Sequence, residues 1–493
     1  TTQTNWSITN LIVLDGTNTT SANGLDVSAD NCEIYGFEIT NFQNGINISN
    51  LSTGGQVGDV NKGNVIPIIG SRGILLEGSD FVVQGNKIGT DNTGMIAGST
   101  GLGIQITGAN NLIGGSATGE ENIICRGVNS AGHGISLSGT GNRVYGNLIG
   151  TDALGTSALP NERGIQITGS NNFIGGPNPG EGNLISGNSF YGIRIRVGAD
   201  GNVIQGNLIG TDINGTSALA NGNEGGIRIL DAADNTLIGG SNSGEGNVIS
   251  GNNRNGISIN NGSFTIIQGN KIGVDINGDP LGNGAHGIGI SAGNSAAVSG
   301  VVIGGTGAGE SNIISYNNDY GIEIDPNLAG AGSADQISFR YNEIFCNSAG
   351  AIDLIDNANS SIASPTINSY TQGTGTGSVT GECTGCTSGD LIDVYRDNET
   401  CGGLAQAKEY LGTVTYTSGM WTLGSLTLTN GDRITAINND VAGNSSELSI
   451  SEPEISLFLG TNNSGTEITD GQVGVIDFGS VVLGTPIDLT FAI

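Results

Sequence analysis

The stretch Gly-Asn-Leu-Ile-Gly-Thr-Asp at residues 146–152 decides the fold, because close copies of it return along the chain. The other copies begin at Gly85, Gly206 and Gly269, about 60 residues apart. Self-similarity at a fixed period is the signature of a repeat architecture, in which one structural unit stacks on the next. The repeat must therefore be interpreted before any single motif.

A second phrase, Gly-Ile-x-Ile, occurs twice in each long unit and shows that the true period is about 30 residues. Gly24-Leu25 opens this series and Gly350-Ala351 closes it. Between them, the glycine of the phrase or of a close variant lies at Gly45, Gly73, Gly103, Gly134, Gly164, Gly192, Gly226, Gly256, Gly287 and Gly321. Each long unit is thus two turns with different loops.

One turn contains three short strands and no helix signal. After Gly164, Ile165 and Ile167 share one face and Gln166 takes the other, which is the alternation of a strand. Residues 172–176 and 183–187 supply two more short apolar runs that end in Gly. Such strands can coil, each pairing in parallel with its equivalent one turn on. The sequence therefore predicts an all-β parallel β-helix of about 11 coils of about 30 residues.

A column of asparagines supports this prediction, since each of its members precedes a pair whose first residue is Val, Ile, Leu, Lys or Glu and whose second is Ile. Stacked Asn side chains can hydrogen-bond along the axis and satisfy polar groups that a coil turns inward. The predicted structural ladder consists of Asn64, Asn86, Asn122, Asn147, Asn183, Asn207, Asn247, Asn270, Asn312 and Asn342.

Composition excludes several other classes of protein. The chain has 88 Gly and 9 Pro among 493 residues, and its formal net charge is -30. Collagen needs a strict three-residue Gly period with abundant Pro, which the chain lacks. A nucleic-acid-binding surface is basic, and no apolar run approaches the ~18 residues of a membrane span. We therefore expect neither a nucleic-acid partner nor a membrane span in this chain.

The repeat pattern ends near residue 356, and the chain then changes character. Alternating strand patterns at residues 391–395, 409–414, 421–423 and 433–437, separated by turn residues, are typical of a small antiparallel sandwich. We expect three domains: a β-helix over residues 1–361, a sandwich over 362–451, and the incomplete start of a further sandwich over 452–493.

The phrases also resemble known families. Residues 149–159, 172–176 and 180–188 resemble the right-handed parallel β-helix repeats of large bacterial surface and secreted proteins in the pectate-lyase/NosD-like superfamily. Residues 436–447 resemble the last strands of a bacterial Ig-like domain, and residues 475–484 the start of a Hydin-like, choice-of-anchor D sandwich. These resemblances imply a right-handed coil and an extracellular, cell-surface protein of the kind common in Bacteroidota. They imply no single chemistry.

The arginines between residues 163 and 228 are the local exception in an acidic chain. Arg163, Arg194, Arg196 and Arg228 are expected to cluster over about three coils, and Arg forks suit carboxylate or sulfate groups. The cluster predicts a groove for an anionic glycan, with Tyr191 as a stacking platform. The alternative is charge balance against nearby acids.

Two sets of acidic residues recur at every second coil. One set lies in the Gly-Thr-Asp loops at Asp91, Asp152, Asp212 and Asp275, and the other lies at Glu120, Glu181, Glu245 and Glu310. Oxygen-rich loops suit Ca²⁺. Equivalent loops are two coils apart, about 10 Å, so they cannot share an ion. Loop capping by Asx-type bonds is the favoured interpretation, with no cofactor required.

Cysteine and histidine give weaker signals. Cys32, Cys125 and Cys346 are expected to be buried single thiols, whereas two of Cys383, Cys386 and Cys401 are expected to form a disulfide. The two histidines, His133 and His286, lie about 24 Å apart along the coil and are expected to be exposed corner residues.

Three function hypotheses follow. The leading one is a secreted or cell-surface repeat protein, a rigid stalk, adhesin or matrix component without catalysis, whose partner is a polysaccharide or the cell-surface or secretion machinery. The second is a polysaccharide lyase or hydrolase with its site on the coil face near Arg163 to Arg228, where carboxylates, or an Arg or Lys with carboxylates, would converge. The third is self-association into filaments through open coil ends or through the unfinished C-terminal sandwich.

Overall fold

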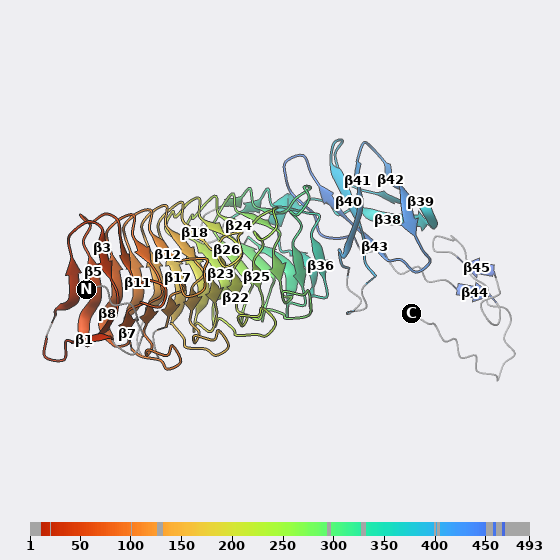
Figure 1. Cartoon of the computed structure of the whole chain (residues 1–493). Helices are drawn as coiled ribbons and strands as arrows, with labels where there is room; N and C mark the ends of the chain where they lie inside the picture. The colour runs from red at the N-terminus through yellow and green to blue at the C-terminus, as the bar shows by residue number, and fades with distance from the viewer. Residues whose placement is uncertain are drawn as a thin grey trace, which may run out of the picture.

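A computed structural model shows a long β-helical rod followed by a smaller antiparallel module (Figure 1). The structure describes residues 11–19, 21–99, 101–125, 132–292, 297–326, 332–398, 401, 405–449, 457–459 and 466–468. The rod is a right-handed parallel β-helix, as the repeats predict, and three long parallel sheets run along it.

Sheet A includes the strands that follow the asparagines of the predicted ladder, and it has 12 members in parallel. They are β1 (Ile12–Asp15), β4 (Phe37–Thr40), β7 (Val65–Ile66), β10 (Lys87–Ile88), β13 (Ile123–Ile124), β16 (Leu148–Ile149), β19 (Leu184–Ile185), β22 (Leu208–Ile209), β25 (Val248–Ile249), β28 (Lys271–Ile272), β32 (Ile313–Ser315) and β36 (Glu343–Phe345).

Sheet B is formed by the Gly-Ile-x-Ile phrases and also has 12 strands. They are β2 (Asn23–Val27), β5 (Phe42–Ile48), β8 (Ile69–Leu76), β11 (Leu102–Ile106), β14 (His133–Leu137), β17 (Arg163–Ile167), β20 (Tyr191–Ile195), β23 (Gly225–Leu230), β26 (Ile257–Asn260), β29 (Ile288–Ser291), β33 (Tyr320–Asp325) and β37 (Gly350–Leu354).

Sheet C completes each coil and has 11 strands. They are β3 (Cys32–Ile34), β6 (Gly55–Val57), β9 (Val82–Val83), β12 (Leu112–Gly114), β15 (Arg143–Tyr145), β18 (Phe173–Ile174), β21 (Val203–Ile204), β24 (Leu237–Gly239), β27 (Ile266–Gln268), β31 (Val302–Gly304) and β35 (Ser338–Arg340). A short parallel pair is formed by β30 (Val298–Ser299) and β34 (Ala334–Asp335), which precede the sheet C strands β31 and β35 along the chain.

The core is a stack of aliphatic side chains, because most strands turn at least one Ile, Leu or Val inward. Ile165, Ile174 and Ile185, one from each sheet of a single coil, are 0% exposed, and their equivalents continue along the rod. Glycine is required at the corners: Gly146 has a φ of +67°, and a Cβ there would lie 2.1 Å from the carbonyl oxygen of Gly115. Only glycine tolerates both the left-handed backbone and this close approach.

Three asparagine ladders run inside the coil rather than one. The first consists of the ten predicted asparagines, from Asn64 to Asn342. Each Nδ2 donates to the Oδ1 of the next Asn at 2.9 or 3.0 Å. Sequence analysis missed the other two ladders, which are Asn111, Asn142, Asn172 and Asn202, and Asn161, Asn188, Asn221, Asn252, Asn283, Asn317 and Asn347. These amides satisfy buried backbone carbonyls at the corners.

The C-terminal module contains two three-stranded antiparallel sheets, an arrangement consistent with a sandwich. A short 3-10 helix, η2 (Ala358–Ser361), leads into it. One sheet is β38 (Thr366–Thr371), β39 (Gly373–Glu382) and β42 (Met420–Leu428), and the other is β41 (Glu409–Thr415), β40 (Leu391–Arg396) and β43 (Ile434–Asn439). A further pair, β44 (Leu457–Leu459) and β45 (Thr466–Ile468), is all that is described of the third expected domain, whose residues 475–484 lie outside the described residues.

The sandwich covers the C-terminal end of the coil. Arg340 in β35 donates two hydrogen bonds, of 2.6 and 2.7 Å, to the fully buried carboxylate of Asp393 in β40. Ile344 and Ala407 exchange backbone hydrogen bonds of 2.8 Å, which extends sheet A by one bridge. At this coil end, sheet A is therefore paired with the sandwich through one bridge.

Two disulfides occur, and one of them corrects the sequence prediction. Cys383 and Cys386 pair within the sandwich, with Cα atoms 5.4 Å apart. Cys346, expected to be a buried single thiol, instead pairs with Cys401 and ties the last coil to the sandwich. The prediction failed because it assigned the two cysteines to separate domains, whereas the end of β36 lies against the sandwich. Cys125 is a buried free thiol, and Cys32 is free and partly exposed.

Candidate functional site

A groove opens on the outer face of sheet B because two consecutive strands carry the smallest side chains. The strand register aligns Arg228, Ser258, Gly289, Glu323 and Asp353 on consecutive strands. Ser258 and Gly289 leave a hollow between the long side chains on either side. The groove has a volume of about 360 Å³, and Arg228, Arg254, His286 and Glu323 are among the residues that line it.

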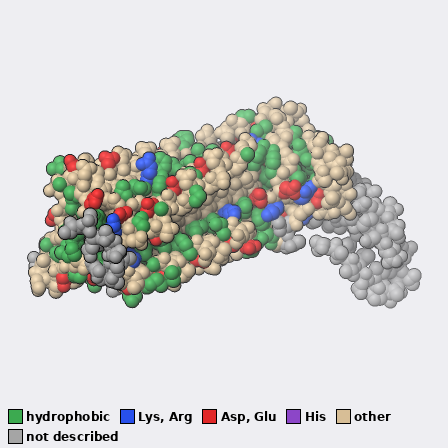
Figure 2. All heavy atoms as spheres, viewed as in Figure 1, with side chains coloured by type: hydrophobic (Ala, Val, Ile, Leu, Met, Phe, Trp, Pro, Cys, Tyr) green, Lys and Arg blue, Asp and Glu red, His purple; other side chains and the backbone are tan. Residues whose placement is uncertain are grey.

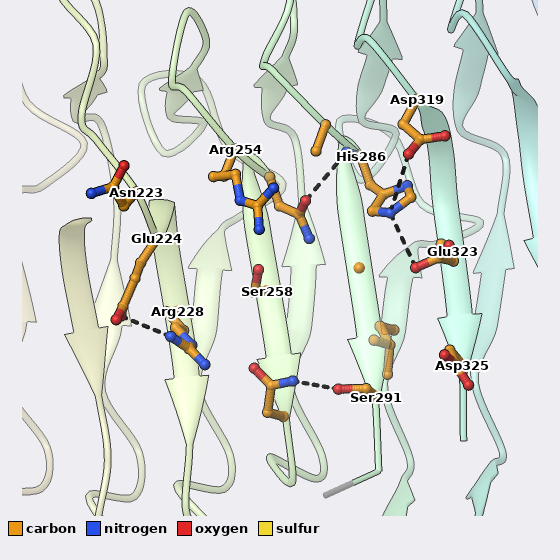
Figure 3. Close-up of a pocket in the computed structure, with 15 residues that line it drawn as sticks. Asn223, Glu224, Arg228, Arg254, Ser258, His286, Ser291, Asp319, Glu323 and Asp325 are labelled. Atoms are coloured by element: carbon orange, nitrogen blue, oxygen red, sulfur yellow. Dashed lines mark hydrogen bonds and ion pairs between the residues drawn. The ribbon is translucent and has the colours of Figure 1, made fainter. Parts of the chain in front are cut away.

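His286 lies at the acidic end of this groove, between two carboxylates (Figure 3). Its Nε2 atom is 3.1 Å from Glu323 Oε2 and 3.6 Å from Asp319 Oδ2. Its side chain is only 14% exposed, and its ring stacks on Tyr320 with centroids 6.2 Å apart. The expectation of an exposed corner residue is therefore wrong for His286, because β33 brings two acids to it.

The charges around His286 shift its protonation. Burial alone would lower the pKa of His286, but the hydrogen bond to Glu323 and the carboxylates of Glu323, Asp319 and Asp353 raise it above the usual 6.5. The imidazole therefore stays in its charged, doubly protonated form to a higher pH than a free histidine does.

Asp353, on the strand after Glu323, lies in the same acidic surroundings. Burial raises its pKa above the usual 3.8, and the nearby carboxylates of Glu447 and Glu323 raise it further, against a smaller lowering by His286. Glu323 and Asp353 are thus neighbouring carboxyl groups, one hydrogen-bonded to a histidine and the other with a raised pKa. Paired carboxyl groups in different environments are the usual arrangement for acid–base work.

The other end of the groove is cationic. Arg228 pairs with Glu224 at 2.8 Å, so its charge is already balanced. Arg254 is exposed and extends over the groove between Arg228 and His286 (Figure 3), and no ion pair is recorded for it with any described residue. On the surface, Figure 2 shows acidic and basic side chains gathered on the viewed face toward the C-terminal end of the rod.

The predicted arginine cluster lies on the same face, and two of its members are paired with neighbouring acids. Arg163 pairs with Glu162 at 3.0 Å and Arg196 with Asp231 at 3.1 Å, which is the charge balance that the alternative interpretation describes. Arg194 lies over the ring of Tyr191, 5.6 Å from its centroid.

Tyr191 is a correction to the sequence analysis. It is 0% exposed, and burial raises its pKa to about 12. A stacking platform must present an open ring face, and this ring presents none. The residue lies on the outer side of its strand, but the side chains around it cover it.

The acidic loops use their carboxylates on themselves. Asp212 Oδ1 accepts the backbone N–H groups of Thr216 and Ser217 at 2.9 and 3.1 Å, and Asp152 does the same with its own loop. Glu181 and Glu245 each accept from the backbone N–H group three residues earlier. Within the described residues, no group of three or more His, Cys, Asp and Glu is arranged to hold a metal ion.

Sequence reasoning missed Arg254, Asp319, Glu323 and Asp353. A signal was present: Glu323 and Asp353 occupy the position of Arg228 in their own Gly-Ile-x-Ile phrases, and Gly289 replaces a side chain at that position. Only when these phrases are aligned as neighbouring strands does the charge change from Arg228 on one side of Ser258 and Gly289 to Glu323 and Asp353 on the other.

No described residue lies in a helix of the length and hydropathy that a membrane crossing requires.

No protein-family model matches the chain, and no curated protein is significantly similar to it in sequence. Among solved structures, the chain is similar to the periplasmic alginate epimerase AlgG, with 13% identity and a TM-score of 0.33 over 70% of this chain and 72% of that one. It is also similar to the A-module of the Azotobacter vinelandii mannuronan C-5 epimerase AlgE4, with 13% identity and a TM-score of 0.26 over 68% of this chain and 86% of that one. At these values the likeness concerns the fold alone.

Proposed function

We propose that the protein is a polysaccharide-active enzyme that cleaves its substrate in the groove on sheet B. The observation that supports this most is the row Ser258, Gly289, Glu323 and Asp353, in which the hollow ends at Glu323 and a second carboxyl group, Asp353, lies on the next strand. A regular repeat that served only as a spacer would have no need to break its pattern there.

The environments of the carboxyl groups suggest their roles. Asp353, whose pKa is raised, would donate a proton to the leaving oxygen of the glycosidic bond. Glu323, which lies 3.1 Å from His286 Nε2, would act as the second carboxylate. Adjacent strands are about 4.8 Å apart, close to the ~5 Å between the two carboxyl groups of retaining glycoside hydrolases.

Arg254 would bind an anionic substituent of the sugar at the other end of the groove. A guanidinium fork matches a carboxylate in two parallel hydrogen bonds. This assignment makes a uronate-containing polysaccharide the favoured substrate class.

The experiment is incubation of the full chain with a panel of neutral and uronate-containing polysaccharides, followed by product analysis. New reducing ends without unsaturation indicate hydrolysis, whereas products with the ultraviolet absorbance of an unsaturated uronate indicate a lyase. Arg254→Ala should raise KM at least 10-fold on uronate polymers and leave neutral polymers unaffected. Absence of any product, with wild type folded, would contradict the proposal.

A second candidate function, a non-catalytic glycan-binding stalk or adhesin, is favoured by a specific observation. Three asparagine ladders and the Cys346–Cys401 disulfide make one stiff body of the coil and the sandwich. Binding of a polysaccharide without turnover would support this function. Two disulfides also favour an oxidising, exported location, and on this basis we propose the bacterial cell exterior. The two antiparallel sheets favour an Ig-like identity for the sandwich.

A further inference from the structure

The outer face of sheet C carries a row of apolar side chains along the rod. The register aligns one outward residue of each strand from β9 to β31: Val82, Leu112, Arg143, Phe173, Val203, Leu237, Ile266 and Val302. Seven of these eight residues are apolar. Phe173 and Ile266 are 36% and 38% exposed, and the other apolar members are half-buried by their neighbours.

The corresponding outward row on sheet A is covered by loops, unlike the row on sheet C. Ile123, Leu184 and Val248 point outward from sheet A, but they are only 6%, 2% and 6% exposed. The Gly-Thr-Asp loops fold over them: a Cβ at Gly94 would lie 2.9 Å from Ile123, and one at Gly155 would lie 2.8 Å from Leu184. No equivalent loop is described over sheet C.

The rows that flank the apolar row are free of charge apart from one residue. The positions two residues before it are corner residues with a positive φ, and they are Asn, Gly and Phe apart from Asp80. The positions two residues after it are Gly, Gln and Tyr. Two glutamines of this row lie along the sheet surface, because the side-chain amide of each donates to a backbone carbonyl of the next strand. Gln205 donates to Gly239 O at 3.0 Å and Gln268 to Gly304 O at 2.9 Å. In a chain with a net charge of -30, this face is distinctive for its lack of charge.

We infer that the sheet C face, defined as these three rows from β9 to β31, is a contact surface for a second copy of the chain. Eight strands at about 4.8 Å make a strip of roughly 35 Å, and three rows make it about 14 Å wide. Two such faces bury on the order of 1,000 Å² together, the lower limit for a specific interface. Sheets stack face to face about 10 Å apart, with side chains interdigitating.

A second copy is the occupant that the period favours. Ridges at the strand spacing interdigitate over their whole length only with a surface of the same spacing, and this chain supplies one. The acids elsewhere on each copy repel one another, so association should strengthen as salt screens them. Association through ion pairs would instead weaken as the salt concentration rises.

The test is sedimentation equilibrium of the full chain at increasing concentration and at low and high salt. We expect a mass of twice 49.6 kDa at high salt and dissociation at low salt. Val203→Lys with Leu237→Lys should raise the dissociation constant at least 10-fold. The matched control is Ser136→Lys with Gln166→Lys, which adds the same charge to outward positions of sheet B and should leave the mass unchanged.

Cross-linking provides a second measurement in case the charged variant folds poorly. In a Cys32→Ser background, Val203→Cys should form a disulfide-linked dimer under mild oxidation, and Gln166→Cys should not. A mass of 49.6 kDa at every salt and concentration, or a dimer that both lysine pairs leave intact, would overturn the inference. A folded monomer that binds a flat neutral glycan through this face would overturn it as well.

Discussion

The Nε2 atom of His286 lies 3.1 Å from Glu323 Oε2, across two neighbouring strands of sheet B. The residue that faces Glu323 in the strand register is Gly289, which has no side chain, so the carboxylate can lean toward the histidine. The same missing side chain opens the groove. One glycine in an outward row therefore creates both the hollow and the charged contact beside it.

The pair makes a titration prediction. Because the folded pKa of His286 is raised, the pair stabilises the fold fully below about pH 6.5, and that contribution is lost as pH rises through the folded pKa. Glu323→Gln should lower the pKa of His286, since it removes the nearest carboxylate. NMR titration of the imidazole measures this directly, with His133, the only other histidine, as the internal reference. An unchanged titration of His286 would contradict the contact.

The asparagine ladder predicts a large stability loss from a single buried amide. Asn183 donates to Asn207 Oδ1 and Val144 O and accepts from Asn147, so Asn183→Ala leaves several buried groups without partners. We expect a loss of about 3 kcal/mol in the free energy of unfolding. Asn253→Ala, on an exposed amide, should change it by less than about 0.5 kcal/mol. Urea denaturation of both variants checks this, and equal losses would refute the ladder's role.

The two disulfides should differ in their contribution to stability. Cys346–Cys401 closes a sequence separation of 55 residues and Cys383–Cys386 one of 3. Loop-closure entropy predicts about 4 kcal/mol for the long loop and under about 2 kcal/mol for the short one. Thermal melts of the double Cys→Ser variants compare them. A larger loss from Cys383/Cys386 would show that the link between coil and sandwich carries little stability.

The acidic loops should fail at low pH. Burial alone would raise the pKa of Asp91, Asp212 and Asp275, but hydrogen bonds from their own loops lower it below 3.8. Their contribution is present above the unfolded pKa and is lost as pH falls through the folded one. The melting temperature should therefore fall when the pH is lowered below about 4. This acid-induced fall should be smaller for Asp212→Ala than for wild type. Addition of Ca²⁺ should not raise the melting temperature, and a clear rise would support the Ca²⁺ alternative.

The coil was predictable from sequence because its cause is local and repeated. Ile165 and Ile167 face inward for the same reason in every turn, and the column from Asn64 to Asn342 follows from that register. The Cys346–Cys401 disulfide was not predictable, because it depends on how the sandwich docks on the last coil. The site was missed for a related reason: Glu323 and His286 are far from Arg228 in sequence, and only the strand order brings them to one groove.

Kinetics of Asp353→Asn on a polysaccharide that wild type cleaves test the central claim most directly. The substitution keeps the shape of the side chain and removes the proton that the raised pKa would hold. The account predicts a fall in kcat of at least about 100-fold with KM nearly unchanged, because the loss is of acid catalysis and not of binding. Ser136→Ala, on the same face outside the groove, should retain the wild-type rate. An Asp353→Asn variant with the wild-type kcat would contradict the account.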